Sequence, residues 1–145
     1  MSFRSVMLVD DNPFDNEIHR LALVRSGVVA GPDAVIVTEG GHEAEQRLRA
    51  GLASRDPSYP PSLILVDVHM PGMSGFDFVE TLAGLSEDEH PGLRSSVVVM
   101  MLSTEVRPSD RARADALEIV RGYTQKPLTK ARALELSARW GADGG

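Results

Sequence analysis

Short apolar runs recur along the chain, and each is bounded by polar or turn-forming residues. Several are rich in β-branched residues, and apolar runs of this length are typical of buried β-strands. They predict five strands: Val6–Val9, Ala34–Val37, Leu63–Val66, Val97–Leu102 and the less apolar Ile119–Thr124.

Helical patterns lie between these runs. After the first run, Asn12 is suited to cap a helix that begins at Pro13, and Gly27 is suited to end it. Further helices are predicted at 41–50 with Gly51 as the stop, at 74–83 with Ser74 as N-cap, at 108–118 and at 129–140. The stretches 52–62 and 84–96 are predicted to be surface loops.

Strands that alternate with helices predict an α/β fold with a doubly wound parallel sheet and helices on both faces. The chain has 145 residues, a length that suits one domain. We therefore expect a single domain over 1–145, with a core from about 4 to 140 and a frayed tail at 141–145. No output domain is expected, because few residues follow Trp140.

Composition narrows the classes of function. Asp and Glu outnumber Lys and Arg by 21 to 15, and the net charge of −6 argues against nucleic-acid binding. The sequence has no cysteine, which excludes disulfides, thiolate catalysis and cysteine zinc sites. No run approaches the ~20 apolar residues of a membrane helix, so we expect a cytoplasmic protein without membrane contact. The histidines at 19, 42, 69 and 90 lack metal-ligand spacing, and we expect them at the surface.

Polar residues follow the predicted strands at the point where each strand ends. They are Asp10 and Asp11 after the first strand, Asp67 after the third, Ser103, Thr104 and Glu105 after the fourth, and Lys126 after the fifth. The carboxyl ends of parallel strands share one edge of the sheet, where ligands bind. Clustered carboxylates repel one another, and Mg²⁺ relieves that repulsion. A lysine and a hydroxyl beside the cation suit an incoming phosphoryl group, which one carboxylate can accept.

Four segments in order resemble the receiver domain of two-component response regulators: VMLVDDNPFD, LILVDVHMPGMSGFDF, VVVMMLSTE and GYTQKPLT. Together they extend over nearly the whole chain. The resemblance is to stand-alone, chemotaxis-receiver-like members, and it implies a flavodoxin-like sheet of order 2-1-3-4-5 with five helices. It also implies phosphoryl acceptance from a sensor histidine kinase or a histidine phosphotransfer protein, with Mg²⁺ or alternatively Mn²⁺. Such a protein catalyses only its own phosphorylation and dephosphorylation.

The resemblance assigns the acceptor and the metal site to particular residues. Asp67 is the implied phosphoacceptor and a metal ligand. Asp11 and the backbone carbonyl of His69 are further implied ligands of the metal. Asp10 is implied to act mostly through water.

The resemblance also implies a switch that reports phosphorylation. Lys126 and Ser103 are implied to contact the phosphoryl group, and Tyr123 is implied to change rotamer with Ser103. The surface formed by 108–118, 119–124 and 129–140 would then bind a downstream protein or a second copy of the chain, unless the protein serves as a phosphate shuttle or sink. A cis Lys126–Pro127 bond belongs to the same pattern.

Some positions depart from the family pattern or flank the acceptor closely. Thr104 stands where the family commonly has a smaller residue, and His69 lies two residues after Asp67. Our hypothesis is that these two side chains tune access to Asp67 and the lifetime of the phosphorylated form. The segment ALEIVRGY replaces the family's usual small-residue and glycine stretch before the fifth strand.

Other classes of function remain to be compared with this one. A phosphohydrolase of the haloacid dehalogenase type needs Asp-x-Asp, whereas this chain has Asp67-Val68-His69. A nucleotide-binding domain would carry a P-loop or GxGxxG after the first strand, and neither is present. The alternative that stays open is a pseudo-receiver, which binds partner proteins without being phosphorylated.

Overall fold

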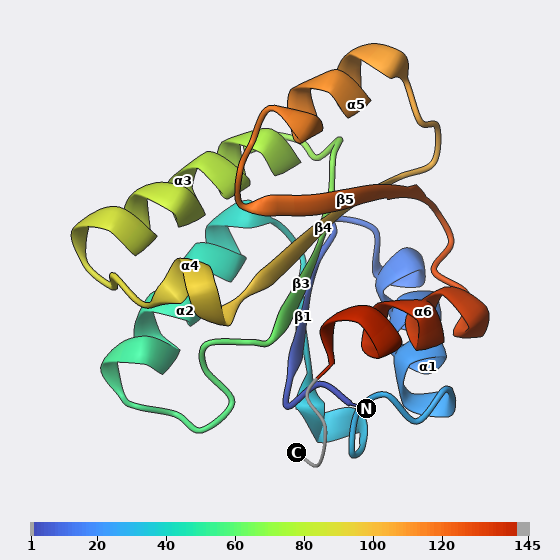
Figure 1. The fold of residues 1–145 in the computed structure, drawn as a ribbon, viewed down its shortest axis with the longest axis horizontal. Coiled ribbons are helices and arrows are strands. Elements are labelled where there is room, and N and C mark those ends of the chain that lie inside the picture. Colours follow the sequence, from blue (N-terminus) through green and yellow to red (C-terminus); the bar gives the residue numbers. More distant parts are fainter. Residues whose placement is uncertain (1, 142–145) are drawn as a thin grey trace.

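A parallel sheet runs through the centre of the molecule (Figure 1). The computed structural model describes residues 2–141, without the side chains of 86–88. Within that part of the chain, five strands form one sheet in the order β2-β1-β3-β4-β5. The strands are β1 (Val6–Val9), β2 (Val35–Thr38), β3 (Leu63–Asp67), β4 (Val98–Ser103) and β5 (Val120–Gln125). This order confirms the predicted doubly wound sheet.

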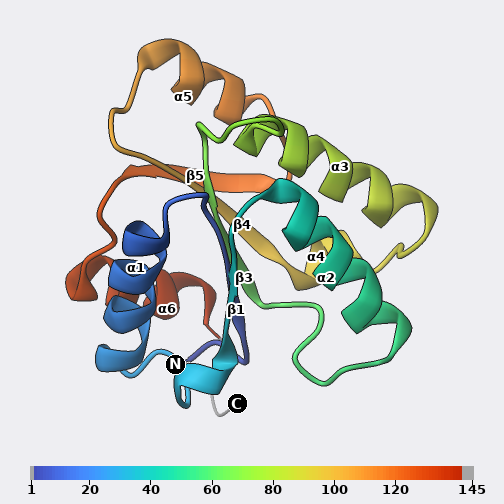
Figure 2. The same cartoon turned by 180° about the vertical axis from the view of Figure 1, so that it is seen from behind.

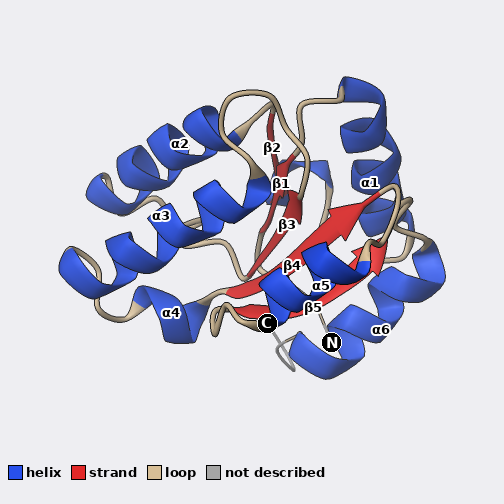
Figure 3. Cartoon of the chain, turned by 90° about the horizontal axis from the view of Figure 1, so that it is seen from above, coloured by secondary structure: helices blue, strands red, loops and turns tan. Residues whose placement is uncertain are grey.

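Helices cover both faces of the sheet (Figures 2 and 3). One face carries α1 (Pro13–Arg25) and α6 (Lys130–Trp140). The other carries α2 (Gly41–Ala53), α3 (Gly75–Asp88), α4 (Leu93–Ser96) and α5 (Pro108–Asp115). A 3₁₀ turn, η1 (Pro32–Ala34), precedes β2. Alternate residues of each strand point to opposite faces, so the sheet separates two buried apolar clusters.

The helices differ in how firmly apolar packing anchors them to the sheet. The buried apolar side chains of α3 are Phe76, Phe78, Val79, Leu82 and Leu85. In α5, which is described over its whole length, Ala114 is the one buried side chain. Burial of a large apolar side chain contributes ~1.5–3 kcal/mol, so α3 is held far more strongly than α5.

The caps predicted for the first helix and for the helix after the third strand are confirmed. The Asn12 side chain accepts a hydrogen bond from the Phe14 amide at 2.9 Å, and Pro13 is the first residue of α1. Gly27 follows the end of α1 with a φ of 76°, in the left-handed region that glycine favours. Ser74 and Asp77 form a reciprocal capping box at the start of α3.

Several predicted boundaries are wrong. Gly51 does not end α2, which continues to Ala53. The glycine instead makes room for Tyr59, because a Cβ at 51 would lie 2.3 Å from the Tyr59 ring. The predicted loop at 84–96 instead contains the end of α3 and the short α4. Within α3, burial of Leu85 offsets the ~1 kcal/mol cost of Gly84 in the helix. Burial of Leu93 anchors α4.

Smaller differences between predicted and observed boundaries occur at other helices and strands. The helix predicted at 108–118 ends at Asp115, and β2, β4 and β5 lie one residue later than predicted. With α4, the described residues form six α-helices rather than five. The predicted tail lies, from residue 142 on, outside the described residues. Among the helices that are described, none is long and apolar enough to cross a membrane.

Candidate functional site

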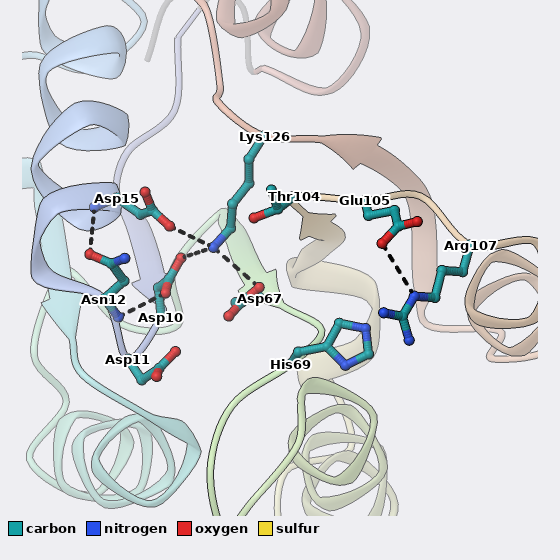
Figure 4. Close-up of a pocket in the computed structure, with 10 residues that line it drawn as sticks. All are labelled: Asp10, Asp11, Asn12, Asp15, Asp67, His69, Thr104, Glu105, Arg107 and Lys126. Atoms are coloured by element: carbon teal, nitrogen blue, oxygen red, sulfur yellow. Dashed lines mark hydrogen bonds and ion pairs between the residues drawn. The ribbon is translucent and has the colours of Figure 1, made fainter.

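The polar strand ends meet in a cleft at one edge of the sheet (Figure 4). Asp10 follows β1, Asp67 is the last residue of β3 and Lys126 directly follows β5. The Lys126–Pro127 bond is cis, as the resemblance implied. The β1–β3 register sets Val9 beside Val66, which brings the residues after them together. The cleft has a volume of about 430 Å³ and is lined by Asp10, Asp11, Asn12, Asp15, Asp67, His69, Thr104, Glu105, Arg107 and Lys126.

Three carboxylates in this cleft form a cluster that could hold a metal ion. Asp10, Asp11 and Asp67 each offer one oxygen, and the three oxygens lie within 4.8 Å of one another. Asp10 and Asp67 are buried, whereas Asp11 is exposed and faces the opening. Mg²⁺ prefers oxygen ligands and keeps several waters, so this partly open set of carboxylates fits it.

Lys126 supplies the positive charge inside the cleft. Its Nζ lies 2.6 Å from Asp10 Oδ2, 2.9 Å from Asp15 Oδ2 and 3.2 Å from Asp67 Oδ1. Burial by itself lowers the pKa of Lys126, but the hydrogen bonds to Asp10 and Asp15 outweigh burial and raise this pKa above its usual value. The lysine is therefore a permanent cation among four carboxylates when Asp11 is counted.

Asp67 lies in an unfavourable environment for a charged carboxylate. Burial raises the pKa of Asp67 from its usual 3.8 to about 6, and the neighbouring Asp10 charge adds to this shift. Lys126 opposes the shift without cancelling it. Without a bound metal ion, the ionised form of the Asp67 carboxyl group is therefore energetically unfavourable in the folded protein.

Removing the charge of Asp67 should therefore raise the free energy of unfolding, by an amount that depends on pH. Without divalent cations, we expect Asp67→Asn to raise the free energy of unfolding by ~2 kcal/mol near pH 7.5. The folded-state pKa of Asp67 is raised to about 6, so above that pH folding must bury an ionised carboxylate. As the pH falls from about 6 towards 4, the folded wild-type protein binds a proton at Asp67 and the gain disappears.

Urea unfolding in EDTA at about pH 7.5 and at about pH 4.5 measures this difference. The exposed Asp33 offers a matched control, because Asp33→Asn removes one charge far from the cleft. Equal stabilities of Asp67→Asn and wild type near pH 7.5 would contradict the expected strain.

Local contacts hold the two buried acids in place. The Asn16 side chain donates to the backbone carbonyls of Asp10 at 3.0 Å and Thr38 at 3.1 Å, which ties the end of β1 to the end of β2. Beyond β3, Gly75 packs against the Asp67 carbonyl, and a Cβ at 75 would lie 2.2 Å from that oxygen. The first turn of α3 can therefore approach the end of β3 only with glycine at this position.

Ser103 and Tyr123 form a buried hydrogen-bonded pair beside the cleft. The Tyr123 hydroxyl donates to Ser103 Oγ at 3.0 Å, and Ser103 in turn donates to the Glu105 carbonyl. Both side chains are buried, so Tyr123 points inward. Ser103 does not line the cleft, unlike its neighbour Thr104. The structure thus joins the two residues that the resemblance implied would move together.

His69 and Thr104 both lie at the cleft, as their sequence positions predict. The His69 ring projects from the loop after β3, and its Nε2 lies 2.9 Å from Asp110 Oδ2 on α5. This contact joins the loop after Asp67 to the start of α5. Thr104 follows β4 and is exposed at the cleft.

The expectation that all four histidines lie at the surface is wrong for His19. His19 is buried on the face of α1 that packs toward the sheet. Burial, with a further contribution from the charge of Lys126, lowers the pKa of His19 below its usual value. His19 is therefore neutral at physiological pH, as a buried side chain near a cation should be.

Sequence reasoning missed one close partner of Lys126, namely Asp15. Asp15 lies in the first turn of α1, directly after the loop that carries Asp11, and the start of this helix faces the same cleft. The signal that could have found it is an acidic residue in the first turn of the helix that follows β1. Glu105 and Arg107 also line the cleft, and the Arg107 guanidinium lies 3.6 Å from the Glu105 carboxylate.

The doubly wound sheet and the acidic cleft at its carboxyl edge define an α/β protein with a cluster of carboxylates that could hold a divalent cation. The response regulator receiver domain family matches residues 6–137 of the chain. The chain therefore belongs to the response regulator receiver family, and its acidic cluster is typical of the magnesium site of such receivers.

Individual relatives agree with this assignment. The two-component response regulator ORR41 of Oryza sativa subsp. japonica is 32% identical over 128 residues, which are 86% of this chain and 84% of that protein. The sensory/regulatory protein RpfC of Xanthomonas campestris pv. campestris is 34% identical over 132 residues, 91% of this chain but 16% of RpfC. A two component response regulator from Cytophaga hutchinsonii has a similar structure, with a TM-score of 0.81, 25% identity, and coverage of 96% of this chain and 97% of its own.

Proposed function

We propose that this protein is a phosphoacceptor response regulator in which Asp67 receives a phosphoryl group from a phosphohistidine. The donor is a sensor histidine kinase or a histidine phosphotransfer protein. The observation that carries this proposal is the position of Asp67, whose carboxylate ends a buried strand 3.2 Å from Lys126 and beside Asp10 and Asp11. A carboxylate with these neighbours is suited to act as a nucleophile at phosphorus.

The proposed transfer uses the side chains that the cleft gathers. A carboxylate oxygen of Asp67 forms a bond to phosphorus as the phosphorus–nitrogen bond of the donor breaks, and the electron pair leaves with the imidazole, which then takes up a proton. Lys126 holds the negative oxygens of Asp67 and of the phosphoryl group. Hydrolysis reverses the modification: water attacks phosphorus, the carboxylate is regenerated and inorganic phosphate leaves.

Asp11, Asp67 and the backbone carbonyl of His69 are the proposed metal ligands, with Asp10 acting mostly through water. When bound there, Mg²⁺ supplies positive charge that neutralises the phosphoryl oxygens, and Mn²⁺ can substitute for it. The crowding of Asp10, Asp11 and Asp67 supports this assignment, because oxygens of the three lie within 4.8 Å of one another. A single ammonium group, that of Lys126, pairs with Asp10 and Asp67 and also with Asp15.

Intact-mass measurement tests the proposal directly. The protein is incubated with phosphoramidate, with either Mg²⁺ or EDTA, and we expect a gain of one phosphoryl group in the Mg²⁺ sample alone. A protein that binds neither Mg²⁺ nor a phosphoryl group, from phosphoramidate or from a phosphorylated histidine phosphotransfer protein, would support the pseudo-receiver instead.

The proposed output is a change at the surface formed by α5, β5 and α6. Its support is the hydrogen bond between Tyr123 and Ser103, which links the end of β4 to β5. If phosphorylation draws the Ser103 hydroxyl toward Asp67, Tyr123 loses this acceptor and its inward rotamer is no longer fixed. The ring signals of Tyr123 in NMR spectra should then shift on phosphorylation, and an unchanged ring would exclude this route to a downstream protein or a homodimer.

The side chains of His69 and Thr104 are expected to lengthen the lifetime of the phosphorylated form. Both line the cleft, so smaller residues there give water easier access to the phosphorus. We expect His69→Asn and Thr104→Ala each to speed dephosphorylation about threefold, a barrier change of ~0.7 kcal/mol. The measurement is the decay of the phosphorylated mass after the donor is removed.

Matched controls are His42→Asn on α2 and Thr81→Ala on α3, which make the same changes outside the cleft. If the cleft variants decay at the wild-type rate, the two side chains do not set the lifetime.

A further inference from the structure

The ammonium group of Lys126 has its donors committed to carboxylates before any phosphoryl group arrives. An ammonium has three N–H donors. The hydrogen bonds run to Asp10 at 2.6 Å and to Asp15 at 2.9 Å, and Asp67 is the most distant of the three carboxylates, at 3.2 Å. The acceptor of the proposed reaction is thus the weakest of the lysine's three partners.

Asp15 and Asp67 lie on different sides of this ammonium group (Figure 4). Asp15 projects from the first turn of α1, where the Asn12 cap accepts a hydrogen bond from its backbone amide at 3.3 Å. Its carboxylate therefore comes from a fixed turn of helix. The contact draws Lys126 toward α1 and away from Asp67.

The three partners differ in how easily they can give up the lysine. The Asp10 side chain is 3% exposed, so it would be left as a buried charge without its partner. The Asp15 side chain is 28% exposed and can be solvated when the lysine leaves. An incoming phosphoryl group therefore competes with Asp15, rather than with Asp10, for the N–H donor that Lys126 gives to Asp15.

We infer that Asp15 is a positioning residue that restrains Lys126 and slows phosphoryl transfer to Asp67. The inference rests on the proposed function. Asp15 acts in two ways: it holds the ammonium on the α1 side of the cleft, and its own negative charge repels the oxygens of an anionic phosphodonor. Both effects weaken when the carboxylate becomes a neutral amide of the same size.

Asp15→Asn is expected to increase the rate constant of phosphorylation by acetyl phosphate and Mg²⁺ about threefold to fivefold, the effect of losing a partly exposed ion pair. Asp15→Glu keeps the charge and is expected to restore the slower rate. Glu17→Gln is the matched control, because it removes one carboxylate from the same helix on the outer, exposed side, where Glu17 pairs with Arg20.

A second measurement reports the position of the lysine without any phosphoryl chemistry. The sequence contains two lysines, Lys126 and Lys130, and Lys130 is exposed at the start of α6. Limited acetylation followed by peptide mass spectrometry gives the ratio of labelling at Lys126 to labelling at Lys130. Release from Asp15 should raise this ratio in Asp15→Asn and leave it unchanged in Glu17→Gln.

The outcomes separate the inference from the function on which it rests. Faster phosphorylation together with a higher labelling ratio in Asp15→Asn, both reversed in Asp15→Glu, supports the role of Asp15. A wild-type protein that is phosphorylated while Asp15→Asn keeps the wild-type rate overturns the inference alone, as does an unchanged labelling ratio. A wild-type protein that accepts no phosphoryl group overturns the proposed function, and the inference with it.

Discussion

Asp67→Asn is expected to abolish phosphoryl transfer, so that no gain in mass occurs with phosphoramidate and Mg²⁺. Asparagine has nearly the same shape but lacks the anionic oxygen that attacks phosphorus. The loss should be complete, because the other acids of the cluster are assigned to the metal and to Lys126. It cannot be attributed to unfolding, since removing the buried charge of Asp67 favours the folded state above about pH 6.

The control for this experiment is Asp33→Asn, which should gain one phosphoryl group at the wild-type rate. Intact mass measures both variants under identical conditions, and peptide mapping of the wild-type protein should place the phosphoryl group on Asp67. A full mass gain in Asp67→Asn would mean that another residue is the acceptor, and the proposed mechanism would be wrong.

The second large effect is expected from Lys126→Met. Removing the cation leaves the buried Asp10 and Asp67 without their partner, which should lower the free energy of unfolding by ~3 kcal/mol in EDTA. Added Mg²⁺ should recover part of that loss, because it supplies positive charge to the same acids. Phosphorylation should slow by about 10²-fold or more even when Mg²⁺ is saturating, since the donor that stabilises the phosphoryl oxygens is missing.

Lys130→Met is the matched control, because Lys130 is exposed and lies four residues further along the chain. Urea unfolding with and without Mg²⁺ gives the stability change, and the rate of mass gain gives the effect on transfer. If Lys126→Met were as stable and as reactive as Lys130→Met, Lys126 would not be the charge that the cleft depends on.

The sequence predicted the sheet and most of the cleft because both follow from strong local signals. An apolar run marks a buried strand such as β3, and the polar residue that ends it, Asp67, must then lie at the edge of the sheet. The same argument placed Asp10 and Lys126, which the structure brings within 2.6 Å of each other. The roles of these residues in phosphoryl transfer stay predictions.

What the sequence did not reveal depends on contacts between distant elements. His19 is polar, yet it is buried where α1 meets the sheet, and its position on the helix became clear only from packing. Gly84 suggested a break, but the burial of Leu85 keeps α3 helical beyond it. Asp15 does not follow a strand but lies in the first turn of α1, so the positions of the strand ends did not indicate it.

Because α5 buries little apolar surface, the helices of this fold differ in how strongly they resist displacement. Tyr123 belongs to the same buried cluster as the side chains of α3, so any outward movement of its ring leaves volume that a neighbour must refill. The many apolar contacts of α3 resist displacement, whereas α5 is held by Ala114, by the polar contact of Asp110 with His69 and by Arg113, which lies over the Phe76 ring. We therefore expect α5 to be more compliant than α3, so that a stimulus at the cleft displaces α5 more readily.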